Sequence, residues 1–502
     1  MSRRPAEAAA GTDLRYAAIF GGAVAVFVIT MLFGISLRVS MREDIDIVAR
    51  AGISRVLTAG ISDFWDTLFI LLLVHAAYLT AVWALWKGFR RAFPAAMAGI
   101  VLAAFAMLPA MPLTSPDAVH LAADVRTFWI HGKWPAEFSG TPDKFDDPVH
   151  NEVRVFRGQP SGYGPLAYAI GGAPLPFVGD DFKANLVGQK VVAGTFLVLT
   201  ALAAALVARR LGQNGGMVAA LIGLNPMMVW QYPGDGHNDS IMAFFGVVAI
   251  GLVIHESWKW RGGGMAAGIA SALCKYGLLL ASPVVAAYWW PRLRNALGAL
   301  AAIGGAGILF LYVFDAGPIT NGTLGPAGAV VPTTPWGVVA SVFDAGGPGR
   351  DRMLVASYMM FLIGLAVIMM YHPLNRPVDV VRAVALTMGF FLFVCSPGYL
   401  AWYLIWFLPF AALSASRWMI AWMIAYSGTA FIPILALNWQ ISMRESWNID
   451  NPVEWSVVVA WLLTIAVVYG AWRGRNWASF GTGAQKKAQG PRFAARQKRA
   501  AR

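Results

Sequence analysis

Residues 17–37 read AAIFGGAVAVFVITMLFGISL, and this stretch contains no charged side chain. A helix needs roughly 20 apolar residues to cross the hydrocarbon core of a bilayer, so the stretch predicts a membrane span. Arg3 and Arg4 precede it, as basic residues precede a secretory signal. The apolar part of a signal has only about 7–15 residues and ends at a small-residue cleavage site, which is not evident here. We therefore expect an uncleaved first span.

Apolar stretches of this kind recur almost to the end of the chain. The further candidate spans are 66–86, 92–113, 186–208, 214–232, 239–255, 295–314, 353–371, 380–396, 399–413, 418–437 and 456–472. The stretch 263–290 carries Lys275 in its middle and is expected to be a broken helix, whereas 165–178 is too short to span and is expected to be re-entrant or interfacial. The sequence predicts an all-α, polytopic membrane helical bundle of about 12–14 membrane segments.

The composition agrees with a chain that uses lipid as part of its solvent. Of its 502 residues, 58% are hydrophobic and 13% are charged, and the mean hydropathy is +0.58. A soluble domain carries about a quarter charged residues. The two cysteines, Cys274 and Cys395, lie inside apolar stretches, so we expect neither a disulfide framework nor a thiolate metal site. No cofactor is indicated.

The net charge is +13, and the basic residues are most concentrated at the C-terminus. Residues 473–502 contain nine lysines and arginines and no acidic residue, which predicts a disordered, basic cytoplasmic tail near anionic lipid. Residues 1–472 are expected to form one membrane domain. Because the chain lacks the alternation of aromatic and basic residues that RNA-binding proteins use, we expect no nucleic-acid partner.

Basic residues in short loops predict the orientation of the chain. Pairs such as Arg209 and Arg210 recur on alternate loops, which places the N-terminus and the tail in the cytoplasm. The loop 38–65 also carries arginines on the opposite face, and its mixed charge predicts an amphipathic segment at the outer surface. That extracytoplasmic face receives the long loops 114–164 and 316–351, so we expect it to be the working face of a plasma (inner) membrane protein.

The loop 114–164 opens with Ser115-Pro116-Asp117. A carboxylate at the boundary of the membrane can serve as a general base, and this is our interpretation of Asp117. The alternative is that Ser115 or Asp117 caps a helix that starts near Ala118. Asp124 follows seven residues later, and for this residue the capping role is favoured.

Two further strings place polar or aromatic residues at helix ends. In Gly162-Tyr163-Gly164-Pro165, a proline at the first helical position explains Pro165, while Tyr163 between two glycines is a candidate to stack on a sugar. In Gly236-His237-Asn238-Asp239-Ser240, one of the residues Asn238 and Asp239 is expected to cap the next helix. A cap needs only one residue, and a helix N-terminus also favours an anion such as phosphate.

Two strings lie in the membrane itself. Lys275 is a cation near mid-membrane, where it costs about 2.5–3.5 kcal/mol, so it is either functional or reaches an interface with its long side chain. The string from Ser396 to Tyr403, SPGYLAWY, combines a helix break with Tyr399, Trp402 and Tyr403, although interfacial belts also use these aromatic residues.

These strings, in this order over about residues 92–440, resemble the polyprenol-phosphate-mannose-dependent α-(1→6)-mannosyltransferases and their relatives among the GT-C membrane glycosyltransferases. The resemblance implies a GT-C-like fold, a sugar donor linked to a lipid phosphate, an extracytoplasmic active site, and inversion at the sugar carbon without a nucleotide donor. The implied sugar is mannose or another hexose, and the acceptor is a glycan or a glycolipid.

The expected mechanism follows from charge. Asp117 takes the proton of the acceptor hydroxyl, while cationic groups stabilise the leaving phosphate. The candidates for that second role are Lys275, Arg154, Arg157 and His237. Tyr163, Trp402 and Tyr403 stack on the sugar or bond to it, and His120, Asp124, Asn238, Asp239 and Tyr399 complete the expected substrate-binding set. No metal ligand set is expected.

A transporter or flippase of a lipid-linked sugar is the main alternative. A broken helix and a lysine in mid-membrane fit that class as well. It predicts internal symmetry between two halves of the chain, which the sequence does not display. A non-catalytic scaffold is a third and weaker hypothesis.

The predicted topology can be tested at position 140, inside the loop 114–164. We expect a cysteine introduced as Gly140→Cys to react with a membrane-impermeant thiol reagent added to intact cells. Protection from outside, combined with labelling from the cytoplasmic side, contradicts both the topology and the extracytoplasmic active site.

Overall fold

The computed structural model describes residues 4–36, 61–87, 89, 92–112, 117–135, 145–153, 161–255, 257–291, 297–298, 300–301, 348–396, 401–433 and 452–473. Most of the predicted span 295–314, most of the loops 38–65 and 316–351, and residues 474–502 of the tail lie outside the described residues. In the described part, every regular element is a helix. The predicted all-α class is therefore confirmed.

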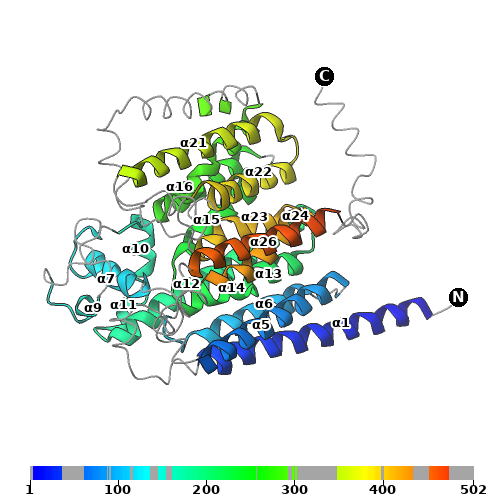
Figure 1. Ribbon diagram of the computed structural model, residues 1–502, viewed down its shortest axis with the longest axis horizontal. Helices are drawn as coiled ribbons and strands as arrows, with labels where there is room; N and C mark the ends of the chain where they lie inside the picture. Colours follow the sequence, from blue (N-terminus) through cyan, green and yellow to red (C-terminus); the bar gives the residue numbers. More distant parts are fainter. Residues whose placement is uncertain are drawn as a thin grey trace.

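Helices of the N-terminal part pack side by side and form one flank of the molecule (Figure 1). They are α1 (Arg4–Ile29) with its π-helical extension η1 (Thr30–Ser36), α5 (Ile61–Lys87) and α6 (Ala92–Met107). Buried apolar side chains of α1, α5 and α6 join one continuous hydrophobic core with the central helices.

The central helices follow. α12 (Phe182–Arg210) packs on α13 (Gly215–Gly223) and α15 (Asp239–Val253), and α15 packs on α16 (Trp258–Cys274). After α16 the chain continues as the 3₁₀ helix η4 (Tyr276–Ala281) and then α17 (Ser282–Trp289). The predicted broken helix at Lys275 is thus present, because Lys275 has extended backbone angles (φ −163°, ψ 139°).

The C-terminal part adds the helices drawn in yellow to red in Figure 1. They are α21 (Pro348–Tyr371), α22 (Pro377–Phe390), η7 (Phe391–Cys395), η8 (Ala401–Tyr403), α23 (Leu404–Leu413), α24 (Arg417–Thr429) and α26 (Pro452–Arg473). α23 is buried along its whole length, which makes it the central helix of this part.

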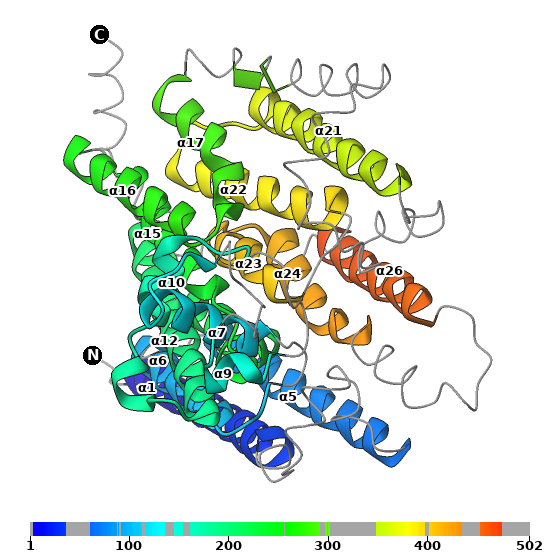
Figure 2. The same ribbon diagram turned by 90° about the vertical axis from the view of Figure 1, so that its left-hand side faces the viewer.

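Four short helices gather at one end of the bundle (Figures 1 and 2). They are α7 (Asp117–Trp129), α9 (Pro148–Asn151), α10 (Pro165–Gly171) and α11 (Leu175–Val178). The segment 165–178 is therefore two short helices rather than a span, as predicted. Each of these helices is too short to cross a bilayer.

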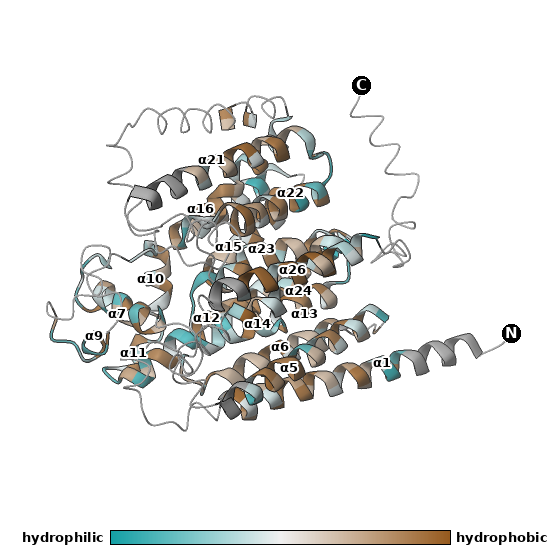
Figure 3. Cartoon of the chain, viewed as in Figure 1, coloured by the Kyte–Doolittle hydropathy of each residue, from teal (hydrophilic) through white to brown (hydrophobic). Residues whose placement is uncertain are grey.

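Five described helices are long and apolar enough to cross a membrane: Asp13–Ile35, Trp65–Lys87, Phe182–Arg210, Pro377–Cys395 and Ser456–Arg473. Shorter apolar helices accompany them, at Phe93–Met107, Pro165–Val178, Asp239–Val253, Tyr276–Trp289, Ala356–Tyr371 and Ala401–Leu413. Apolar residues cover most of the bundle helices, whereas α9 and the segments around it carry more polar residues (Figure 3). A polytopic membrane protein is the class that this pattern defines.

Two predicted spans end earlier or break, and proline explains both differences. The predicted span 92–113 ends as a helix at Met107, since Pro109 and Pro112 follow directly. The predicted span 214–232 divides at Asn225, whose side chain accepts bonds from the next turn and starts α14 (Pro226–Val229). The π-helical turn η3 (Trp230–Gly234) then leads to the turn before α15.

A buried lysine on α12 fixes the point where the chain leaves α6. The ammonium group of Lys190 donates to the carbonyl oxygens of Met107 (2.9 Å), Leu108 (2.7 Å) and Ala110. Met107 is the last residue of α6, and Leu108 and Ala110 follow it. A cation at a helix C-terminus also stabilises the helix dipole. Lys190 thereby joins α12 to the chain segment that leads toward α7.

We expect Lys190→Met to lower the stability of the folded protein by at least about 2 kcal/mol, because it leaves several buried carbonyl oxygens without a donor. Thermal unfolding in detergent measures the effect. Lys183→Met on the same helix is the control, since Lys183 is exposed. Equal melting temperatures for the two variants would show that the hydrogen bonds of Lys190 to the carbonyls after α6 do not stabilise the fold.

Candidate functional site

Polar side chains from separate segments of the chain meet where the four short helices adjoin the bundle. They come from the first turn of α7, the turn before α15, the break after α16, and the segment η8–α23. This end of the molecule faces the viewer in Figure 2. The contacts between these segments define the candidate site.

Asp117 is the first residue of α7, where the positive end of the helix dipole stabilises a carboxylate. Its side chain is 25% exposed, and its Oδ2 lies 3.6 Å from Nδ1 of His237. This distance is too long for a hydrogen bond, so the two side chains are close neighbours without a direct bond. The position suits both roles that we considered, because a carboxylate here stabilises the helix and is also open to a proton donor.

The turn before α15 depends on Gly236, which has a left-handed backbone with φ +78°. A Cβ at this position would lie 3.1 Å from Cβ of Ala118 and 3.3 Å from Cγ of Lys190, so the turn is pressed against both α7 and α12. Glycine is the residue that tolerates this geometry without strain.

The expected capping role of this turn is wrong. Asn238 occupies the N-cap position of α15, but its side chain makes no capping bond. Asp239 turns its Oδ1 toward Trp406, whose Nε1 donates at 2.9 Å, and toward Lys275. Neither side chain is used to start the helix, which leaves both available for another purpose.

Several buried polar atoms of the turn have no hydrogen-bond partner among the residues that the structure describes. They are both ring nitrogens of His237, both amide atoms of Asn238, and Oδ2 of Asp239. A buried polar group without a partner costs about 1–3 kcal/mol. Ordered water or the hydroxyl and phosphate oxygens of a substrate are partners that these atoms fit.

Lys275 turns inward to pair with Asp239, so of the two alternatives the one in which it reaches an interface is wrong. Its Nζ lies 2.9 Å from Oδ1 of Asp239. The ring centroids of Tyr163 and Tyr403 lie 4.7 Å from Nζ, and that of Trp406 lies 5.7 Å away. The ammonium group is therefore held by one carboxylate inside an aromatic box, where cation–π attraction adds to the ion pair.

Trp402 stacks on His237, with ring centroids 3.9 Å apart and the ring planes at 16°. Its backbone carbonyl accepts a hydrogen bond from the hydroxyl of Tyr232 at 2.5 Å. One face of Trp402 is thus occupied, which leaves only the other for a sugar. Its neighbour Tyr403 lies against Trp406, with centroids 4.8 Å apart.

Tyr163 is placed by the glycine that follows it. The amide of Gly164 donates to the carbonyl oxygen of Cys274 at 2.9 Å, which ties the end of the loop to the helix break at Lys275. A Cβ on Gly164 would collide with the carbonyl oxygen of Leu273. The glycine is required because the two backbones approach so closely.

His120 and Asp124 pair with each other along α7, with His120 Nδ1 3.6 Å from Asp124 Oδ2. Asp124 is buried in the middle of the helix, so the expected capping role is wrong for this residue. Arg154, Arg157 and Tyr399 lie outside the described residues.

The sequence reasoning missed Trp406, Tyr232 and Lys190. Trp406 lies four residues after Trp402 and so on the same face of a helix, which is a weak signal. Lys190 had a stronger sequence signal, since a lysine inside an apolar stretch indicates a specific partner. Tyr232 had no signal that distinguishes it from an interfacial tyrosine.

Burial, together with the positive charge of Lys275, holds the pKa of His237 well below its usual value. The imidazole is therefore neutral at pH 7. A neutral ring can donate one hydrogen bond, so His237 would offer a substrate a hydrogen bond rather than a positive charge.

Fold and site together define a polytopic α-helical membrane protein with a polar site at its helix ends. The family model described as "Alpha-(1->6)-mannopyranosyltransferase, N-terminal domain" matches residues 19–291, and the chain belongs to this family. A curated protein of Corynebacterium glutamicum, alpha-(1->6)-mannopyranosyltransferase A, is 30% identical to it over 140 residues, which are 28% of this chain and 27% of that protein. The chain thus spans about a quarter of the length of that relative. No solved structure matches.

The depressed pKa of His237 predicts a loss of stability in acid. Below about pH 6.5 the unfolded chain binds a proton at this histidine and the folded chain does not, so stability falls with decreasing pH and is unaffected above that range. At pH 5 the effect reaches about 2 kcal/mol. We expect His237→Gln to have a smaller drop in melting temperature between pH 7.5 and pH 5 than the unaltered protein.

His255→Gln is the matched control, because His255 is a half-buried histidine away from the site. It should retain the full acid-induced drop. If His237→Gln retains it too, His237 is not the neutral, buried group described above.

Proposed function

We propose that this protein transfers mannose, or another hexose, from a polyprenyl-phosphate-linked donor to a glycan or glycolipid acceptor. The reaction takes place on the extracytoplasmic face of the plasma membrane and inverts the anomeric carbon. Membership of the mannopyranosyltransferase family supports the reaction class. The observation that carries the proposal is the meeting of a partly exposed carboxylate, Asp117, with a caged cation, Lys275, through the turn His237–Asp239.

In the proposed step, Asp117 is the general base. The acceptor hydroxyl oxygen attacks the anomeric carbon from the face opposite the phosphate, and its proton moves to a carboxylate oxygen of Asp117. The bond between the anomeric carbon and the phosphate oxygen breaks, and polyprenyl phosphate leaves with the electron pair. Partial exposure suits Asp117 to this role, because the acceptor arrives from water.

The leaving phosphate gains negative charge, and Lys275 is the described cation best suited to stabilise it. Asp239 pairs with the ammonium group and fixes its position. Because aromatic rings surround the ammonium group, we propose that the phosphate approaches between the rings of Tyr163 and Tyr403 and bonds to a hydrogen that Asp239 does not use. A preorganised donor of this kind is worth about 3 kcal/mol in the transition state. Arg154 and Arg157 remain proposed partners of the same phosphate.

The sugar is proposed to lie between these two charges. Asn238 and Asp239 Oδ2 offer buried hydrogen-bonding atoms that suit sugar hydroxyls. The rings of Tyr163 and Tyr403 already cover Lys275, so a sugar beside the phosphate would meet the edges of these rings or the face of Trp402 opposite His237. His120 and Asp124 are proposed to contribute from α7.

A transporter or flippase of a lipid-linked sugar remains the second candidate, because a helix broken at a buried lysine is found in transporters as well. The two functions differ in one product. An enzyme releases polyprenyl phosphate, whereas a flippase returns the intact lipid-linked sugar on the other side of the bilayer.

We expect Asp117→Asn to insert normally, to bind the lipid-linked donor, and to transfer sugar at least about a hundredfold more slowly. Asparagine keeps the size of the side chain but cannot accept the proton at neutral pH. Transfer of radiolabelled mannose from polyprenyl-phosphate-mannose to a glycan acceptor by the purified protein measures the rate. Asp181→Asn is the matched control, since Asp181 caps α12 with its side chain and asparagine caps equally well.

Near-normal transfer by Asp117→Asn, together with an inactive Asp124→Asn or Asp239→Asn, would identify a different carboxylate as the base. Normal transfer by all three, or translocation of the intact donor by the unaltered protein, would refute the proposed glycosyltransferase reaction.

A further inference from the structure

A second polar cluster lies at the other end of α7 from Asp117. His131 follows the last turn of α7, Asp147 precedes α9, and His150 lies within α9. A helix of this length separates the two ends by about 20 Å. The cluster is therefore distinct from the candidate site around Lys275.

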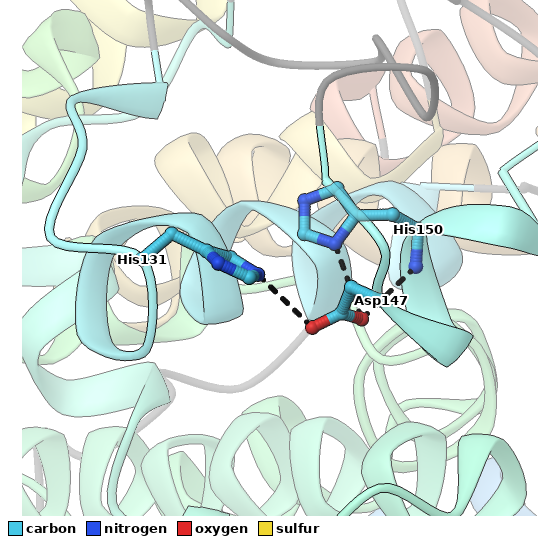
Figure 4. A group of neighbouring side chains, drawn as sticks. All are labelled: His131, Asp147 and His150. Atoms are coloured by element: carbon cyan, nitrogen blue, oxygen red, sulfur yellow. Dashed lines mark hydrogen bonds and ion pairs between the residues drawn. The ribbon is translucent and has the colours of Figure 1, made fainter.

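Both imidazole rings of the cluster turn toward the carboxylate of Asp147 (Figure 4). Nε2 of His131 lies 3.1 Å from Oδ2, and Nδ1 of His150 lies 3.2 Å from Oδ1. One atom from each of the three side chains lies within 4.8 Å of the other two. Asp147 and His150 are buried, and His131 is partly exposed, so the cluster has one side open to entry.

The protons around His150 make its Nδ1 a suitable ligand. The hydroxyl of Thr127 donates to the carbonyl oxygen of Ala123 at 3.0 Å, as threonines on helices commonly do. When it does so, Nε2 of His150, 2.7 Å from the same hydroxyl, must be the donor of that second bond. Nδ1 of the neutral ring then presents a lone pair to the carboxylate, and either a proton on Nδ1 or a metal cation between the two groups removes this repulsion.

Arg126 holds the carboxylate from another direction. Its Nε lies 3.0 Å from Oδ1 and 2.8 Å from Oδ2 of Asp147, and its two terminal nitrogens bond to the carbonyl of Gly179 and to Asp180. Ligating carboxylates are usually oriented by such outer hydrogen bonds. The two aspartates outnumber the one arginine, so the surroundings carry one net negative charge before a cation binds.

We propose that His131, Asp147 and His150 bind a divalent transition-metal cation of the Zn²⁺ class. Two imidazole nitrogens and one carboxylate are ligands that Zn²⁺ prefers, at about 2.0–2.2 Å. Ligands at that distance on a tetrahedron are about 3.3 Å apart. Each ring nitrogen lies near that separation from one carboxylate oxygen, 3.1 Å from Oδ2 for His131 and 3.2 Å from Oδ1 for His150, and all three ligand atoms lie within 4.8 Å of one another. Small rotations of the rings close the remaining gap.

The cation would have a structural role. It would join the end of α7 to α9 and so clamp residues 145–153, part of the long loop 114–164, onto the helix that begins with Asp117. His131 also stacks on Phe145, with ring centroids 4.2 Å apart, which restricts its ring before any cation binds. This proposal does not depend on the proposed transferase reaction.

The test uses the full-length protein without a histidine tag, purified in detergent, treated with EDTA and desalted. Calorimetric titration with ZnCl₂ should give one tight site per chain, and Co²⁺ in its place should give the visible absorption bands of a tetrahedral site. We expect His131→Gln and His150→Gln each to weaken Zn²⁺ binding at least about tenfold. His255→Gln is the matched control and should bind Zn²⁺ as the unaltered protein does.

The proposal is overturned if the unaltered protein takes up no more Zn²⁺ than a variant that carries both His131→Gln and His150→Gln, or if neither single glutamine variant weakens binding. If the variants fail to fold, the Co²⁺ spectrum of the unaltered protein decides alone. Tetrahedral bands support the site, and an octahedral aqueous spectrum refutes it.

Discussion

The ion pair between Lys275 and Asp239 is the interaction on which the candidate site depends. Removing one partner from a buried pair leaves a charge without compensation, at a cost of about 3–5 kcal/mol. This pair joins the helix break after α16 to the first turn of α15, and Trp406 extends it to α23. Tyr163 and Tyr403 cover the ammonium group, so the loop before α10 and the segment η8 are held by the same charge. Five segments are thereby fixed by one salt bridge.

Much of the helical framework can be predicted from the sequence, because a membrane span is a local signal of length and apolarity. The apolar stretch 186–208 becomes α12 with only small changes at its ends, and Lys275 marks a real break. The predicted ends of the spans 92–113 and 214–232 were wrong, and both errors lie at prolines. The predicted span 214–232 ignored Pro226, although the residue before a proline rarely continues a helix.

The contacts of the candidate site could be predicted only in part. Residues such as His237 and Lys275 were found because a polar residue at a membrane helix end is unusual. What they touch depends on packing between segments more than a hundred residues apart, as with the bond from Trp406 to Asp239, and one sequence carries no signal for such pairs. The capping interpretation of Asp239 failed for the same reason, since Lys275 and Trp406 engage its carboxylate instead of the first turn of α15.

The order of the chain gives the two buried lysines a further meaning, for the assembly of the protein during synthesis. A lysine that enters the bilayer alone is unfavourable by about 2.5–3.5 kcal/mol. Lys190 follows the carbonyls of residues 107–110 that it binds, and Lys275 follows Asp239. Each lysine is therefore synthesised after the groups that it binds. Those groups are already in the membrane when the lysine is inserted. Only the aromatic cover from η8 and α23 is added afterwards, which makes closure of the box around Lys275 a late event in folding.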